Sequence, residues 1–171
     1  MIQQAAINQT MLRMLEEYTG LVVVPSNTTK KMPAYPFISY TIIKTSTKKG
    51  TYSVATEIEN VDGEEVQTNT RYMPLLQKWS FTIQSDSDAE AQYFALLCKD
   101  FFECAKYQEL ADCGIIVADV GDITPRDNML TIEYEYRKGF DVSIRLNNVT
   151  VDTENVTIDT VTINDMTLEK E

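Results

Sequence analysis

The chain has 171 residues and a formal net charge of −11, with 43% hydrophobic and 24% charged residues. This size and composition are typical of one globular domain with a hydrophobic core, and the acidic balance argues against a protein that grips nucleic acid phosphates over its whole surface. The sequence has no histidine, which removes the commonest general base and metal ligand and therefore argues against an enzyme.

No sequence feature indicates a membrane span or a secretory signal. The longest apolar runs fall well short of the roughly 18 residues that cross a bilayer, and the start, Met1–Gln4, has no basic patch followed by an apolar stretch. We therefore expect a protein made and kept in a cytoplasm. The spacing of Cys98, Cys104 and Cys113 matches no common zinc or redox motif, so we expect all three to fill the core as small apolar residues.

The first half of the chain predicts a helix followed by strands. Residues 2–18 carry apolar side chains at helical spacing, and Gly20 is placed to end that helix. A short strand over 21–24 and a central strand over 37–43 follow, both rich in β-branched or aromatic residues. Between about residues 45 and 75 we expect a protruding hairpin or loop. The helical stripe consists of Ile7, Met11, Met14, Leu15 and Tyr18.

The next segment predicts a half-buried strand and a second helix. Residues 77–84 alternate between apolar and polar side chains, with Trp79, Phe81 and Ile83 on one face and Lys78, Ser80 and Thr82 on the other. Ser87 and Glu90 have the spacing of a capping box, which predicts a helix over 88–106. Its apolar face is expected to use Ala89, Tyr93, Leu96, Leu97, Phe101 and Cys104.

The last part of the chain predicts strands. A strand over 114–120 and a turn over 125–128 lead into a long alternating strand from Leu130 to Leu146. The alternation keeps its parity across Gly139, which therefore indicates a bend or a close backbone approach.

The tail repeats an apolar-Thr-apolar-acidic pattern in short segments that must pair with their own sheet or with a neighbouring subunit. The repeats are Val149–Asp152, Val156–Asp159, Val161–Asn164 (with Asn last) and Met166–Glu169. These elements predict an α+β fold, a mostly antiparallel sheet flanked by two helices, with a protruding hairpin and a β-rich C-terminal extension. We expect an α+β domain over 1–147 and the extension over 148–171.

Charge is uneven along the chain. Residues 18–56 have no acidic side chain, whereas residues 147–171 contain six acidic residues and one lysine. Contact between copies, positive face to negative face, would use this asymmetry; contact with DNA in a channel and a simple solvated surface are the alternatives. The candidate subunit or channel contacts on the basic side are Lys30, Lys31, Lys44, Lys48 and Lys49.

Three further charged residues, Glu133, Glu135 and Arg137, alternate along the long strand. They could form a catalytic carboxylate cluster, but alternating opposite charges on one strand face more often form cross-strand or intersubunit pairs, so we class them with the candidate contacts. The aspartates at 86, 88 and 127 match no calcium loop. We expect no catalytic residue, metal or cofactor.

One stretch is distinctive: RDNML at 126–130 followed by YEYRKGFDV at 134–142. It resembles the ending of neck and tail terminator proteins from phages of Gram-positive hosts. Three other segments fit that family: PAYPFISY at 33–40, QKWSFT at 77–82, and SDSDA at 85–89 before a helix. The resemblance rests on the order and spacing of these motifs, since each of them is short.

The resemblance covers roughly residues 5–147 and implies a structural virion protein. Such a protein forms a ring, usually a hexamer, on the last ring of the tail tube, stops tube growth and offers a docking face to the filled head. The implied partners are other copies of the chain, the major tail tube protein, head-completion or connector proteins, and genomic DNA that passes through the channel without specific binding.

Two other function classes stay open. A head-tail connector, stopper or tail tube protein would share the assembly setting, and indefinite tubes of the purified protein would favour the last. A small carboxylate-based hydrolase or ligand-binding α+β domain is the remote alternative. A deep pocket with convergent carboxylates would favour that class.

Overall fold

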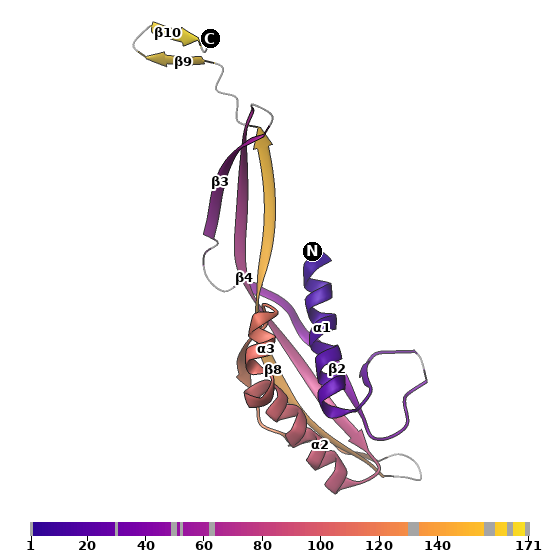
Figure 1. The fold of residues 1–171 in the computed structure, drawn as a ribbon. Helices are drawn as coiled ribbons and strands as arrows, with labels where there is room; N and C mark the ends of the chain where they lie inside the picture. The colour runs from indigo at the N-terminus through magenta and orange to yellow at the C-terminus, as the bar shows by residue number, and fades with distance from the viewer. Residues whose placement is uncertain are drawn as a thin grey trace. The chain divides into compact units, whose positions relative to one another are not determined.

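The computed structural model describes residues 2–29, 31–48, 51, 53–61, 64–129, 134–155, 160–163 and 166–169. The described part of the chain is α+β, as predicted, with an eight-stranded, mostly antiparallel sheet, three α-helices and a separate two-stranded sheet (Figure 1). In chain order the elements are α1 (Ile2–Thr19), β1 (Val23–Pro25), β2 (Phe37–Lys48), β3 (Ser53–Val61), β4 (Glu64–Ser85), α2 (Asp88–Asp100), the π-helical turn η1 (Phe101–Ala105), α3 (Tyr107–Asp112), β5 (Ile116–Val120), β6 (Thr124–Pro125), β7 (Asn128–Met129), β8 (Tyr134–Asn155), β9 (Thr160–Ile163) and β10 (Met166–Glu169).

The large sheet has the strand order β1-β2-β4-β8-β5, while β3 pairs with β4, and β6 and β7 pair with β8. The β1–β2 pairing is parallel; β2 and β3 both run antiparallel to β4. The chain divides into two compact units. The first comprises Met1–Gly50 and Pro74–Asn147, and the second Thr51–Met73 and Asn148–Glu171.

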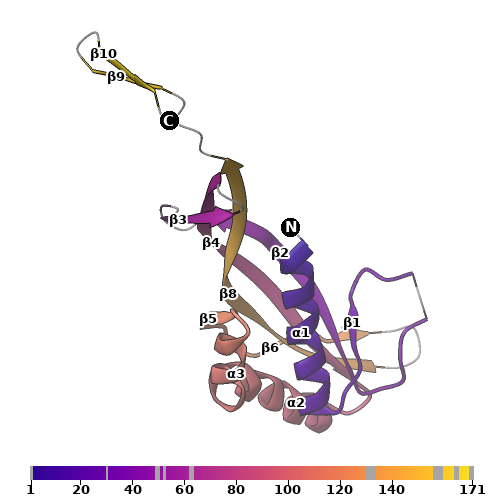
Figure 2. The same cartoon turned by 45° about the horizontal axis from the view of Figure 1, so that its top comes forward.

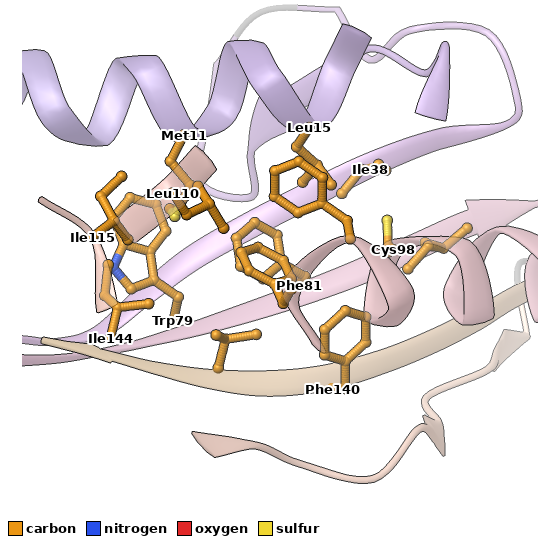
Figure 3. Close-up of a cluster of buried hydrophobic side chains, with 14 of the residues drawn as sticks. Met11, Leu15, Ile38, Trp79, Phe81, Cys98, Leu110, Ile115, Phe140 and Ile144 are labelled. Carbon is orange, nitrogen blue, oxygen red and sulfur yellow. The ribbon is translucent and has the colours of Figure 1, made fainter. Parts of the chain in front are cut away.

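The core of the first unit lies between one face of the sheet and the helices α1 and α2 (Figure 2). In β4, Trp79 and Phe81 are buried and their neighbours Lys78 and Ser80 are not, so the predicted alternation is confirmed. Figure 3 shows Met11 of α1 reaching into the same cluster. Each fully buried large apolar side chain contributes roughly 1.5–3 kcal/mol to stability.

Helix α1 begins and ends as the sequence predicts. Its stripe packs through Met11 and Leu15, which are fully buried. The helix ends at Thr19, and Gly20 follows with a φ of 72°, a left-handed conformation in which glycine has no Cβ penalty. The Gly20 amide donates to the carbonyl of Glu16 at 2.8 Å, which closes the last turn.

The predicted apolar face of the second helix was wrong at Ala89, Tyr93 and Leu96, which are exposed, and right at Phe101, which is buried. Small residues, Ala91, Ala95 and Cys98, form the buried face, whereas Tyr93 is 61% and Leu96 54% exposed. Alanine has no bulk beyond Cβ, so a helix with alanines facing the sheet can pack close to it, and the larger side chains turn outward. The expected single helix over 88–106 also ends early, at Asp100.

The π-helical turn η1 follows α2 directly. Because a π turn holds more residues than an α turn, it places the adjacent Phe101 and Phe102 both in the core, with ring centroids 4.9 Å apart. The predicted core position of Cys104 was therefore wrong, and so was that of Cys113, because both are exposed. Cys98 alone of the three cysteines is buried, and burial raises the pKa of its thiol to about 12.

The capping box at the start of α2 was also wrong in detail. Ser87 occupies the N-cap with extended backbone angles, but its side chain makes no capping hydrogen bond. Ser85 acts two residues earlier: its hydroxyl donates to Glu90 at 2.5 Å, and its oxygen accepts from the Ser87 amide at 3.1 Å. A hydrogen bond between a serine and Glu90 is thus present at the start of the helix, but the serine is Ser85 and not Ser87.

The remaining strand predictions are largely confirmed. The strand expected over 21–24 is β1 at Val23–Pro25, and the expected hairpin is β3 with β4, paired in one continuous register from Ser53 with Tyr72 to Val61 with Glu64. Residues 62–63, between these two strands, lie outside the described residues. The last two repeats of the tail overlap β9 and β10, which pair antiparallel with each other.

Within the described residues, no helix combines the length and the apolar character that a membrane span requires.

We predict that Leu110→Ala lowers the free energy of unfolding by about 2–5 kcal/mol, because Leu110 is fully buried and its loss leaves a cavity. Leu96→Ala should change it by less than about 1 kcal/mol, because that side chain is 54% exposed on α2. Urea denaturation of both variants gives the two values. If Leu96→Ala lowered the free energy of unfolding as much as Leu110→Ala does, the observed buried face of α2 would be contradicted and the face expected from the sequence favoured.

Candidate functional site

The guanidinium of Arg126, between β6 and β7, joins three other side chains. Its Nη1 donates to the hydroxyls of Ser80 at 2.6 Å and Thr82 at 3.1 Å, and its Nη2 donates to Asp141 at 3.1 Å. Ser80 and Thr82 alternate with the buried side chains of β4, so this network lies on the sheet face opposite the core. Lys78 completes it, with its Nζ 3.1 Å from the second carboxylate oxygen of Asp141.

Gly139 makes room for this network. It pairs with Thr124 across β6 and β8, and a Cβ at position 139 would lie 2.8 Å from Cζ, Nε and Nη1 of Arg126. A bend or a close backbone approach was predicted at this glycine. The group that lies close to it is the side chain of Arg126, thirteen residues earlier, and not another stretch of backbone.

Asp127 ties the same loop to β8 a second time. Its Oδ1 accepts from the backbone amide of Arg137 at 2.8 Å, and its Oδ2 lies 3.7 Å from Nζ of Lys138. Lys138 also contacts Asp88 at the start of α2, at 2.6 Å. The hydrogen bond to Asp88 is the main reason that the pKa of Lys138 is raised.

Asp141 is held as a charged carboxylate. Partial burial alone would raise its pKa, but hydrogen bonds from Ser80, Lys78 and Arg126 outweigh that effect and hold the pKa below its usual value. The carboxylate therefore stabilises the fold at neutral pH as the acceptor of the network.

A second polar cluster surrounds Glu135 in β8, whose side chain is only 5% exposed. Its Oε1 accepts from the hydroxyl of Tyr35 at 2.6 Å, and its Oε2 accepts from Nε of Arg137 at 2.6 Å. Tyr35 in turn stacks on Phe37 with ring centroids 5.6 Å apart. The buried charge is thus paired and hydrogen-bonded within the chain, as a buried carboxylate must be.

The predicted contact residues lie in several places. Lys31 and Lys44 are exposed, Lys44 on β2, and Lys48 ends β2. Glu135 and Arg137 lie together in β8 and pair with each other. The positions of Lys30, Lys49 and Glu133 lie outside the described residues. A role of these residues in contacts between subunits or in a channel stays a prediction.

The carboxylates of both clusters are paired within the chain. Asp141 is bonded to Arg126, and Glu135 accepts hydrogen bonds from Tyr35 and Arg137. Among the described residues, no group of three or more Cys, Asp or Glu side chains is placed to hold a metal ion. The two clusters thus join segments of the fold to one another.

A model of the family described as phage neck terminator protein matches residues 9–171. The chain belongs to the phage neck terminator protein family. That family is one of structural virion proteins, so this neck terminator is a component of the neck or tail of a virion. The match includes residues 148–171, for which the sequence motifs alone gave no family likeness.

Comparison with known proteins adds little beyond the family. No curated protein matches this chain. Twelve chains of solved structures match, among them one from the "virion of native gene transfer agent (GTA) particle", with 12% sequence identity and a TM-score of 0.37. That match covers 85% of this chain and 94% of the other.

We predict that Gly139→Ala displaces the Arg126 guanidinium and lowers the free energy of unfolding by about 1.5–3 kcal/mol, the range for hydrogen bonds to charged groups. The same substitution in an Arg126→Ala background should cost little, because nothing is left to displace. Chemical denaturation of the four proteins in this cycle measures the coupling. Additive losses would show that Gly139 is needed for another reason.

We predict that Asp141→Asn destabilises the neck terminator at neutral pH and that the difference from wild type disappears in acid. The folded-state pKa of Asp141 is lowered from 3.8, so its contribution is fully present above that value and is lost as the pH falls through the folded pKa. Denaturation of both proteins between pH 2 and 7 checks this. A difference that does not change with pH would contradict the assigned charge.

Proposed function

We propose that this neck terminator assembles with copies of itself into a ring, as a hexamer, on the head-proximal end of the tail tube. There it stops tube growth and offers the docking face for the filled head. The observation that carries this proposal is the family match over residues 9–171. The sequence motifs at 126–130 and 134–142 support it independently.

The internal pairing of the motif residues supports an assembly role. Arg126, Asp141 and Glu135 are the charged groups that a reaction would most readily use, and all three are engaged within the chain. Exposed charges such as Lys31 and Lys44 are the groups left to meet other molecules. Recognition between virion proteins then works through complementary surfaces.

The proposed partners are the major tail tube protein on one side of the ring and head-completion or connector proteins on the other. Genomic DNA passes through the channel without specific binding, which agrees with the net charge of −11. The proposed contact residues toward neighbouring copies or the channel are Lys30, Lys31, Lys44, Lys48, Lys49, Glu133 and Arg137, while the buried Glu135 holds Arg137 from within the same copy.

Two further assignments belong to this proposal. Residues 1–147 act as the terminator domain and residues 148–171 as a β-rich extension of it. The motif resemblance to proteins from phages of Gram-positive hosts supports a host of the same group.

We predict that a phage whose gene for this chain is disrupted makes tails of excessive length and filled heads that remain unattached. The physical reason is that nothing then covers the growing end of the tube. Electron micrographs of lysates, with tail lengths measured against wild type, provide the test, and the gene supplied in trans is the control. Tails of normal length joined to heads in the mutant lysate would contradict the proposed function.

A further inference from the structure

Two strands of the sheet continue well beyond the strands that cover their outer edges. The first is β2. The parallel strand β1 pairs with it only from Ile38 to Tyr40, whereas β2 itself runs on to Lys48. In the part of the chain that the structure describes, no strand pairs with Thr41–Lys48 on the side away from β4.

The second strand is β8. Its partners β5, β6 and β7 follow one another along β8 and pair with it between Tyr134 and Arg145. Beyond Arg145 the strand continues to Asn155. Among the described residues, no strand pairs with Leu146–Asn155 on the edge of β8 that β5 occupies earlier in the strand. β2 and β8 are the two neighbours of β4 in the sheet order.

Open strand edges present unpaired backbone amides and carbonyls, and they pair readily with another strand. Each of these two edges also exposes a large apolar side chain. Ile43 on β2 is 49% exposed and Val151 on β8 is 59% exposed. Both features are typical of strands that add to a partner's sheet.

The two open edges carry opposite charge. The β2 edge contains Lys44, which is exposed, and Lys48, and it has no acidic residue. The β8 edge contains Asp152, which is exposed, and Glu154, and it has no basic residue after Arg145. Oppositely charged residues on neighbouring strands stabilise their pairing, and like charges oppose it.

This charge pattern disfavours pairings between like edges of two copies. A β2 edge paired with another β2 edge brings lysines together, and a β8 edge paired with another β8 edge brings Asp152 near Glu154. The outer edge of β3 carries Glu57 and Glu59, so it too would repel the β8 edge. Unlike charges meet where the β2 edge of one copy pairs with an acidic edge of another, either β8 or β3, and substitution of Glu57 and Glu59 separates these two.

We propose that the open β2 edge, Thr41–Lys48, of one copy adds to the open β8 edge, Leu146–Asn155, of the next copy. The basic β2 edge then lies alongside the acidic β8 edge. Because the two edges differ, each copy donates one and accepts the other, and such a heterologous contact repeats until the ring closes. This interface rests on the proposed ring and names the strands and charges that close it.

Charge exchange tests the interface directly. One variant, Lys44→Glu/Lys48→Glu, makes the β2 edge acidic; a second, Asp152→Lys/Glu154→Lys, makes the β8 edge basic. Each variant alone should lose the ring that wild type forms, as measured by native mass spectrometry and negative-stain electron microscopy, alone and with tail tubes added. An equal mixture of the two should recover rings, because every contact then joins an acidic edge to a basic one.

The matched control is Glu57→Lys/Glu59→Lys, which makes the same change at the same spacing on β3 and should leave ring formation unchanged. Circular dichroism confirms that each variant is folded. Rings formed by either edge variant alone, or a mixture that stays monomeric, would overturn the edge pairing while the ring itself stands. A wild-type chain that forms no ring, even on tail tubes, would contradict the proposed function as well.

Discussion

The bond between Arg126 and Asp141 is the interaction on which the helix-free face of this sheet depends. One guanidinium joins two hydroxyls of β4 to a carboxylate of β8, and Asp127, the next residue, fixes the same loop to β8 through a backbone amide. Such charge-assisted bonds have defined geometry, so they fix where the loop lies as well as adding stability. This interaction also explains the glycine at position 139, because any side chain there would take the space that the guanidinium of Arg126 occupies.

This interaction gives a physical reason for the family motif. The Arg-Asp pair at 126–127 and the Lys-Gly-Phe-Asp run at 138–141 are two halves of one contact, with Phe140 pointing into the core and its neighbours serving the opposite face. A motif of this kind resembles a reaction centre in sequence, because it concentrates charged residues. In three dimensions Arg126, Asp127, Lys138 and Asp141 pair with one another, so these charges join parts of the fold.

Sequence predicted those parts of the fold that depend on local periodicity. The alternation around Trp79 and the spacing around Met11 report which side faces the core, whatever lies across from it. The face of α2 could not be found this way, because the choice of Ala95 over Leu96 depends on how closely the helix approaches the sheet. The partner of Glu135 is Tyr35, one hundred residues earlier, and only the folded chain brings them together.

Assembly is the remaining step from fold to function. The central proposal is that this chain works through contacts between copies, while the Arg126 network stays inside each copy. A cryo-electron microscopy reconstruction of the neck of the intact virion measures both. The account predicts a closed ring of this chain at the head-proximal end of the tail tube, with Arg126 bonded to Asp141 of its own copy. A single copy at that position, or an Arg126 that bonds to a neighbouring copy or to another virion protein, would contradict it.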